Sequence, residues 1–130
     1  MSSRVNYSSN SVWEDVVGYS RVVRIGNIIE VSGTVAADET GLPIGRDDAY
    51  QQTISILQKI ESSLQMAGAT MKDVIRTRMF VTDISRFNDF AKAHSEYFGV
   101  IKPCTSMIEV KGLVSPDYLI EIEATAVVSS

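Results

Sequence analysis

Charged side chains occupy alternate positions in two segments whose other positions are largely apolar. Glu121 and Glu123 lie in LIEIEATAVV, and Arg76 and Arg78 lie in VIRTRMFVT. Alternate residues of an extended strand project to one side of a sheet. A carboxylate shielded from water can have a raised pKa and act as an acid or base, and an arginine can hold an anion. Two readings stay open: a catalytic Glu121 with ligand-binding Arg76 and Arg78, or interface ion pairs among these residues.

Few other side chains could do chemistry. His94, the only histidine, lies on the apolar side of a helical segment, where we expect a hydrogen-bonded, half-buried residue and not a catalyst. Cys104 is the only cysteine, so no intramolecular disulfide is possible, and nucleophilic chemistry would need a nearby base. Because no second histidine or cysteine pair exists, we expect no transition-metal site. GNIIEVSG lacks the spacing of a phosphate-binding loop.

The overall charge disfavours some partners. The chain has 16 acidic and 12 basic residues, a formal charge of −4 that on average repels nucleic acid and anionic membranes. The N-terminal segment has no apolar run resembling a signal-peptide core, and no segment approaches the roughly 20 apolar residues that span a bilayer. With the single cysteine, these features predict a cytoplasmic protein without a membrane partner, and they disfavour nucleic-acid partners.

The N-terminal half predicts a hairpin that is apolar on both sides. Residues 1–12 are rich in serine and asparagine, and we expect a flexible segment there, followed by a single domain over 13–130. Gly26-Asn27 separates two β-branched runs, which is a hairpin signal. Pairing across this turn places Val23, Ile25 and Ile28 on one face and Val22, Ile29 and Val31 on the other. Both faces should therefore be covered.

The remaining chain predicts helices at 47–67 and 85–98, a strand at 74–81 and two closing strands at 104–110 and 119–128. A strand between two helices favours crossover connections, so the simplest architecture is an α+β fold with a mixed sheet and both helices on one face. The bare face would then be an oligomer interface. In the two closing strands we expect the alternate apolar positions, which include Ile108 and Ile120, to face the helices. Thr105, Met107 and Glu121 should then face the other way.

Several motifs together resemble the RidA/YjgF family of reactive-intermediate deaminases. They are IIEVSGT, QMAGAT followed by KDVIRTRMFVTDISRF, SEYFGVIKP, and IEV followed by IEIEATAVV, and the resemblance covers about residues 17–128. It implies a chorismate-mutase-like fold, a homotrimer with ligand clefts between subunits, and hydrolysis of reactive 2-imino or 2-enamino acids without metal or organic cofactor.

The resemblance also implies roles for individual residues. The family tyrosine before the first strand matches Tyr19, the small pair at the end of the hairpin matches Ser32 and Gly33, and the glutamate that positions the attacking water matches Glu121. The arginine that grips the substrate carboxylate is replaced by Thr105.

Two further departures fall in the same cleft. An asparagine of many deaminating members falls on Ala91, and a frequent cysteine falls on Met107. The pattern resembles subgroups that lack the arginine. Thr105 and Met107 remain candidate ligand-binding residues.

Three functions follow for such a chain. The first is hydrolysis of a small imine or enamine, and the second is a non-catalytic trimer that binds a metabolite or acts as a chaperone. The third, endoribonuclease or translation inhibition, is a label attached to parts of the family. The acidic composition argues against the third.

Overall fold

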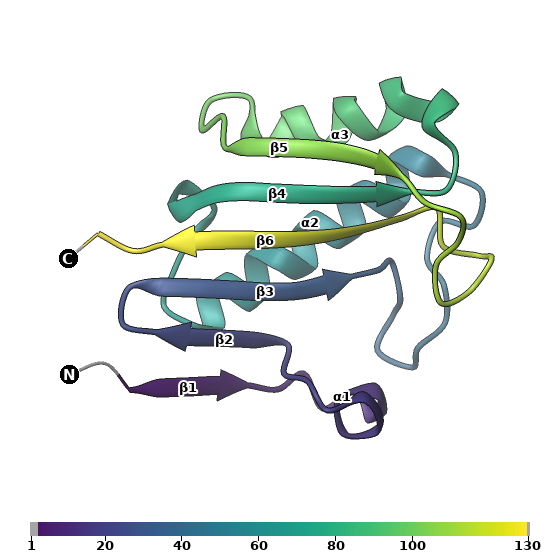
Figure 1. Ribbon diagram of the computed structural model, residues 1–130. Helices are drawn as coiled ribbons and strands as arrows, with labels where there is room; N and C mark the ends of the chain where they lie inside the picture. The colour runs from purple at the N-terminus through teal and green to yellow at the C-terminus, as the bar shows by residue number, and fades with distance from the viewer. Residues whose placement is uncertain (1–2, 130) are drawn as a thin grey trace.

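The computed structural model describes residues 3–129 and shows one six-stranded mixed sheet with the order β1-β2-β3-β6-β4-β5 (Figure 1). Only β4 and β5 run parallel. The strands are β1 Arg4–Tyr7, β2 Val22–Ile25, β3 Ile28–Thr34, β4 Val74–Val81, β5 Cys104–Glu109 and β6 Ile120–Val127. The helices are α1 Val12–Val17, α2 Ala49–Met66 and α3 Phe87–Phe98, with short 3-10 turns η1 Met71–Asp73 and η2 Ile84–Arg86.

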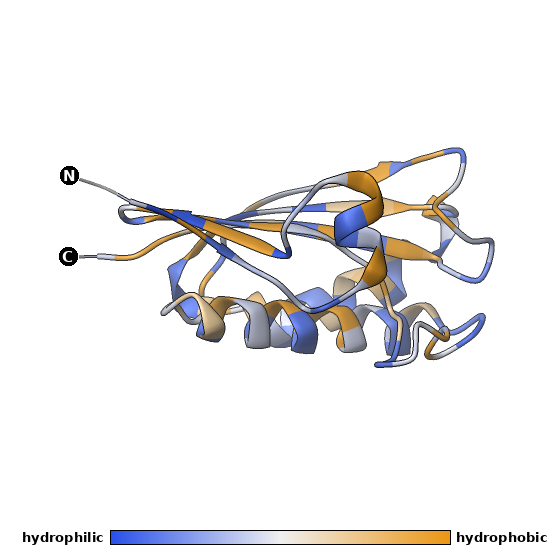
Figure 2. Ribbon diagram, turned by 90° about the horizontal axis from the view of Figure 1, so that it is seen from below, coloured by the Kyte–Doolittle hydropathy of each residue, from blue (hydrophilic) through white to orange (hydrophobic). Residues whose placement is uncertain are grey.

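Helices α2 and α3 lie against the same side of the sheet, as the sequence predicts (Figure 2). We refer to this side as the helix face and to the other as the open face. The core between the layers is apolar, and its largest fully buried side chains include Ile56, Leu57 and Phe90. Within the part of the chain that the structure describes, no helix is long and apolar enough to cross a membrane.

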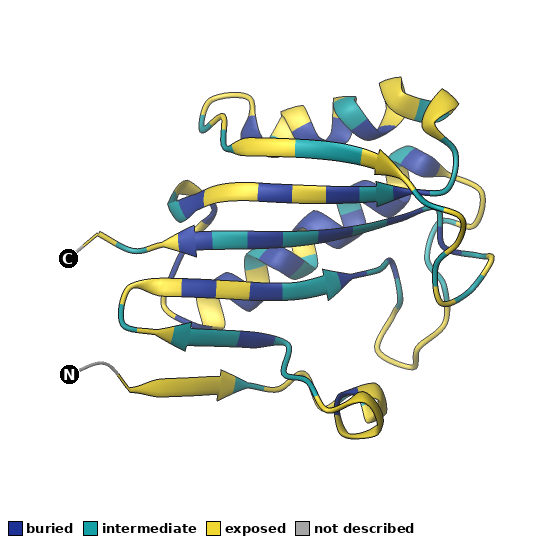
Figure 3. Ribbon diagram, in the orientation of Figure 1, coloured by how far each residue is buried: buried dark blue, intermediate teal, exposed yellow. Residues whose placement is uncertain are grey.

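The hairpin is confirmed, including its two faces. Ile25 pairs with Ile28 across Gly26, whose positive φ of 57° suits the tight turn. Val22 and Val31 are buried on the helix face, whereas Ile25 and Ile28 are exposed on the open face (Figure 3). The first long helix begins slightly later than predicted, because the side chain of Asp48, and not Asp47, caps it by accepting a hydrogen bond from the Gln51 N–H.

Within residues 3–12, where we expect a flexible segment, the structure contains a strand and the start of a helix. Arg4–Tyr7 pairs antiparallel with β2, and Ser11 caps α1. Residues 1 and 2 lie outside the described residues. The strand forms because the outer edge of β2 offers unpaired backbone groups, a tertiary cause that composition does not reveal.

Two assignments of strand faces are also wrong. A regular alternation would place Ile75 on the buried side of β4, together with Thr77, and Val74 on the other side. A shift in the β4–β6 register between Val74 and Arg76 instead buries Val74 and exposes Ile75. In β5, Thr105 and Met107 pair with Thr77 and Met79, which are buried on the helix face. Paired residues of adjacent strands share a face, so Thr105 and Met107 lie on the helix face and not on the open face.

Gln52 ties α2 to two loops through a fully buried amide. Its nitrogen donates to the carbonyls of Gly45 and Asp117, at 3.2 and 2.8 Å, and its oxygen accepts from the Leu119 N–H at 2.8 Å. One side chain therefore satisfies three backbone groups and anchors the segment that enters β6.

We predict that Gln52→Leu lowers the free energy of unfolding by about 2–4 kcal/mol, because those backbone groups lose their partner. The measurement is denaturant unfolding at one fixed protein concentration. The matched control is Gln51→Leu at the exposed neighbouring position, expected to stay within about 0.5 kcal/mol. Equal stability of the two variants would contradict the anchoring role.

Candidate functional site

Tyr19, Arg21, Ser32, Gly33 and Glu121 form a cluster, called here the Glu121 cluster, where β3 meets the start of β6. The Arg21 guanidinium lies 5.6 Å from the centroid of the Tyr19 ring and donates to the Gly33 carbonyl at 3.1 Å. The Ser32 hydroxyl donates to the carbonyl of Ser20 at 2.7 Å, beside Tyr19. The structure thus brings together the four residues Tyr19, Ser32, Gly33 and Glu121 that the family resemblance selected.

An irregularity in β3 creates the space that the Glu121 carboxyl occupies. The β3–β6 register shifts between Val31 and Thr34, so Ser32 and Gly33 lie in the irregular part. A Cβ atom added to Gly33 would lie 2.3 Å from Oε2 of Glu121. Only a glycine leaves room for the carboxyl in this position.

The environment of Glu121 shifts its acidity. Burial raises the pKa of the Glu121 carboxyl, the charge of Glu123 raises it further, and the nearby Arg21 opposes both effects. The net direction is upward from the ordinary glutamate value. A carboxyl shifted in this way exchanges protons more readily near neutral pH than an ordinary surface glutamate.

Arg21 is a member of the cluster that the sequence analysis did not select. Besides its contact with Gly33, it donates to the Thr34 hydroxyl at 2.8 Å, so it holds the irregular part of β3 in place. The sequence feature that could have indicated Arg21 is its position two residues after Tyr19. Its contacts with β3, however, depend on how the strands pair.

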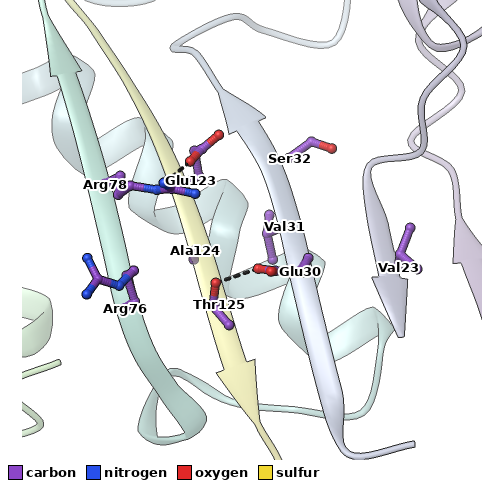
Figure 4. Close-up of a pocket in the computed structure, with 9 residues that line it drawn as sticks. All are labelled: Val23, Glu30, Val31, Ser32, Arg76, Arg78, Glu123, Ala124 and Thr125. Carbon is purple, nitrogen blue, oxygen red and sulfur yellow. Dashed lines mark hydrogen bonds and ion pairs between the residues drawn. The ribbon is translucent and has the colours of Figure 1, made fainter. Parts of the chain in front are cut away.

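A shallow hollow of about 250 Å³ lies beside the cluster on the open face, lined by side chains from β2, β3, β4 and β6 (Figure 4). Arg78 and Glu123 form an ion pair at 2.9 Å, as one of the two readings expected, and the Thr125 hydroxyl donates to Glu30. Arg76 has no ion pair within residues 3–129. Arg76 is therefore the better candidate of the two arginines for holding an anionic group.

Thr105 and Met107 lie apart from the hollow. The Thr105 hydroxyl accepts a hydrogen bond from Thr77 at 2.7 Å, and Met107 packs against the core. His94 is buried and hydrogen-bonded to Thr77 at 2.9 Å, which confirms the expected hydrogen-bonded histidine. Among the described residues, no group of three or more His, Cys, Asp or Glu side chains could hold a metal ion.

The fold and this cluster define a class, that of the α+β proteins with one mixed sheet and two long helices on one face. A crystal structure of a YjgF/YER057c/UK114 family member from Mycobacterium tuberculosis superposes with a TM-score of 0.88 at 48% identity, covering 97% of this chain and 100% of the other. The family model described as endoribonuclease L-PSP matches residues 11–128.

Curated relatives agree with this class. A RutC family protein of Pyrococcus abyssi is 38% identical over 109 residues, which are 83% of this chain and 84% of the relative. The 3-aminoacrylate deaminase RutC of Acinetobacter baylyi is 34% identical over 108 residues, 83% of this chain and 85% of the relative. The chain belongs to the YjgF/RidA family, and the resemblance inferred from its motifs is confirmed.

We predict that Gly33→Ala leaves the protein folded but pushes the Glu121 carboxyl toward water, because its flexible end can move whereas the backbone cannot. The pKa of Glu121 should then fall toward the ordinary glutamate value. A pH titration of the side-chain carboxyl followed by ¹³C NMR measures this. Gly112→Ala, where an added Cβ meets nothing within 4 Å, is the control and should leave the Glu121 titration unchanged. An unaltered midpoint in Gly33→Ala would show that this packing does not set the acidity.

Proposed function

We propose that the protein hydrolyses a small reactive imine or enamine in clefts between the subunits of a homotrimer, with Glu121 as the catalytic acid and base. The observation that carries the proposal is the half-buried Glu121 carboxyl with its raised pKa, packed against Gly33 beside Arg21 and Tyr19. A deaminase acting on 3-aminoacrylate is among the relatives, which supports an imine or enamine as the substrate class.

The chemistry requires one carboxyl and one water molecule. The substrate reacts as its protonated imine, which an enamine forms by taking a proton from solvent at carbon. The ionised Glu121 carboxylate takes a proton from water as the water oxygen bonds to the imine carbon, which gives a neutral carbinolamine. Glu121 returns that proton to the nitrogen and then takes the hydroxyl proton as the C–N bond breaks, so the carbonyl forms and ammonia leaves. The proton on Glu121 finally passes to ammonia, which restores the carboxylate. A group that alternates between base and acid works best when its pKa lies near the working pH, so the upward shift of Glu121 favours both steps.

Other members of the Glu121 cluster have supporting roles in this proposal. Tyr19 and Ser32 orient the ligand, and Gly33 lets the ligand and the Glu121 carboxyl approach the backbone closely. Arg21 fixes the irregular segment of β3 through its bonds to Gly33 and Thr34. Arg76 on the open face is available for an anionic part of the ligand.

The test generates 2-iminopropionate in situ with an amino-acid oxidase and follows its loss with and without the protein. We expect Glu121→Gln to lose about 100-fold or more of the acceleration, the usual size of a general acid–base contribution. Glu39→Gln, at an exposed loop position, is the matched control and should retain full activity. No acceleration beyond that of an inert protein would refute the enzyme, and saturable binding without turnover would favour a non-catalytic metabolite-binding protein.

The homotrimer is proposed because the open face exposes apolar side chains that a monomer would leave in water. Ile25, Ile28 and Ile75 are 44%, 55% and 50% exposed there. A sheet face of this kind is typical of a surface covered by a partner. Three copies related by a threefold axis would cover it and close the ligand clefts.

We predict that sedimentation equilibrium gives three times the mass of one chain, and that Ile28→Glu shifts the protein toward monomer by placing a charge on the open face. Val100→Glu, at a 95% exposed loop position, is the control and should remain trimeric. A monomeric wild type at micromolar concentration would contradict the assembly and the intersubunit cleft with it.

A further inference from the structure

Thr105, Thr77 and His94 form a continuous chain of hydrogen bonds that runs from the surface into the core. Thr105 is exposed on the edge strand β5, Thr77 is fully buried on β4, and His94 is buried on α3. The hydroxyls of Thr105 and Thr77 are 2.7 Å apart, and Nε2 of His94 is 2.9 Å from the Thr77 hydroxyl. We call these three residues the Thr105 relay.

The register explains why the chain forms. Thr77 and Thr105 are direct partners in the parallel β4–β5 pair, so their side chains project together toward α3. The His94 ring is held by α3, where it packs against Phe98 at a centroid distance of 4.8 Å. Thr77 and His94 already satisfy one another as buried polar groups, so Thr105 is not needed to avoid an unpaired group.

The relay has two hydrogen-bonding directions. A hydroxyl can donate one hydrogen bond and accept others, and a neutral imidazole nitrogen either donates or accepts. If Nε2 carries the proton, His94 donates to Thr77, Thr77 donates to Thr105, and the Thr105 proton is free to point outward. If Nε2 lacks the proton, the chain reverses, and Thr105 presents only lone pairs to a ligand. The tautomer of a buried ring thus selects what an exposed hydroxyl offers.

The relay carries no net charge. Burial lowers the pKa of His94, which keeps the imidazole neutral at neutral pH, and both hydroxyls are neutral. A carboxylate gains most from a charged donor such as a guanidinium, which these three residues do not supply. An uncharged carbonyl, amide or imine group needs only the single hydrogen bond that Thr105 can give or take.

We propose that Thr105 is a specificity-determining residue that binds an uncharged carbonyl, amide or imine group of the ligand, and that Thr77 and His94 position its hydroxyl as donor or acceptor. The inference deepens the proposed function, since it takes the ligand to be a small carbonyl or imine compound. It assigns the part of the ligand at Thr105 to a neutral group and not to a carboxylate.

The test uses His94 as a reporter, because it is the only histidine of the chain and gives one pair of imidazole nitrogen signals. Pyruvamide and pyruvate, which match in size but differ in charge, are titrated into ¹⁵N-labelled full-length protein. We expect pyruvamide to shift the His94 nitrogen signals, with pyruvate binding at least about tenfold more weakly, a difference of roughly 1.4 kcal/mol. Neither probe contains an imine, so the result does not depend on turnover.

Two substitutions at Thr77 separate the relay from packing. Thr77→Val keeps the volume but removes the hydroxyl, and we expect the His94 signals to stop responding to pyruvamide. Thr77→Ser keeps the hydroxyl but loses a methyl group, and we expect the response to remain even though stability falls. A purely structural role for Thr77 predicts that both variants respond as the wild type does.

Substitutions at Thr105 test the contact itself. Thr105→Val should abolish the response, Thr105→Ser should retain it, and Thr105→Arg should reverse the preference in favour of pyruvate. The proposal is overturned if pyruvate binds as well as pyruvamide to the wild type, if pyruvamide produces no His94 response, or if the response persists in Thr77→Val. Failure of imine hydrolysis with this response intact would remove the proposed activity and leave the Thr105 site standing.

Discussion

The close packing of the Glu121 carboxyl against the backbone of Gly33 is the constraint on which the candidate site depends. A carboxylate loses hydration in such a position and is costly to keep ionised, so its pKa rises. The position exists only because β3 is irregular at Ser32 and Gly33, and because Arg21 binds both Gly33 and Thr34 across that irregularity. The glycine at position 33 and the irregular backbone of β3 together give Glu121 this environment.

Strand β6, which contains Glu121, determines which residues lie on each side of the sheet. Ile120, Ile122, Ala124 and Ala126 are at most 2% exposed on the helix face, which fixes the register of both neighbouring strands. The intervening residues must then lie on the open face, where Arg78 and Glu123 form an ion pair. The helix face near β5 instead contains a neutral hydroxyl–imidazole chain. The two sides therefore offer a ligand different chemistry.

Sequence patterns predicted the features that depend on strong local signals, namely the Gly26 turn, the two long helices and the alternation in β6. They failed where the pairing between strands determines on which side of the sheet a residue lies. The residues of the edge strand β5 are polar or partly exposed on both sides of the sheet. Their alternation therefore does not indicate which residues face the helices. Only the parallel register with β4 places Thr105 beside Thr77. The register shift at Val74 and the added edge strand β1 are likewise products of pairing.

The replacement of the family arginine by Thr105 is more than the loss of a charge. A guanidinium has donors and no acceptor, so an arginine at this position could donate to Thr77 but could not accept the hydrogen bond that Thr77 donates to Thr105. Only one of the two directions of the chain would then remain. A threonine extends the chain to the surface and couples the exposed hydroxyl to the tautomer of a buried ring. The substitution therefore removes a positive charge and also allows the side chain to accept a hydrogen bond. Because Thr77 and His94 determine which of the two it does, the effect of the substitution depends on all three residues of the relay.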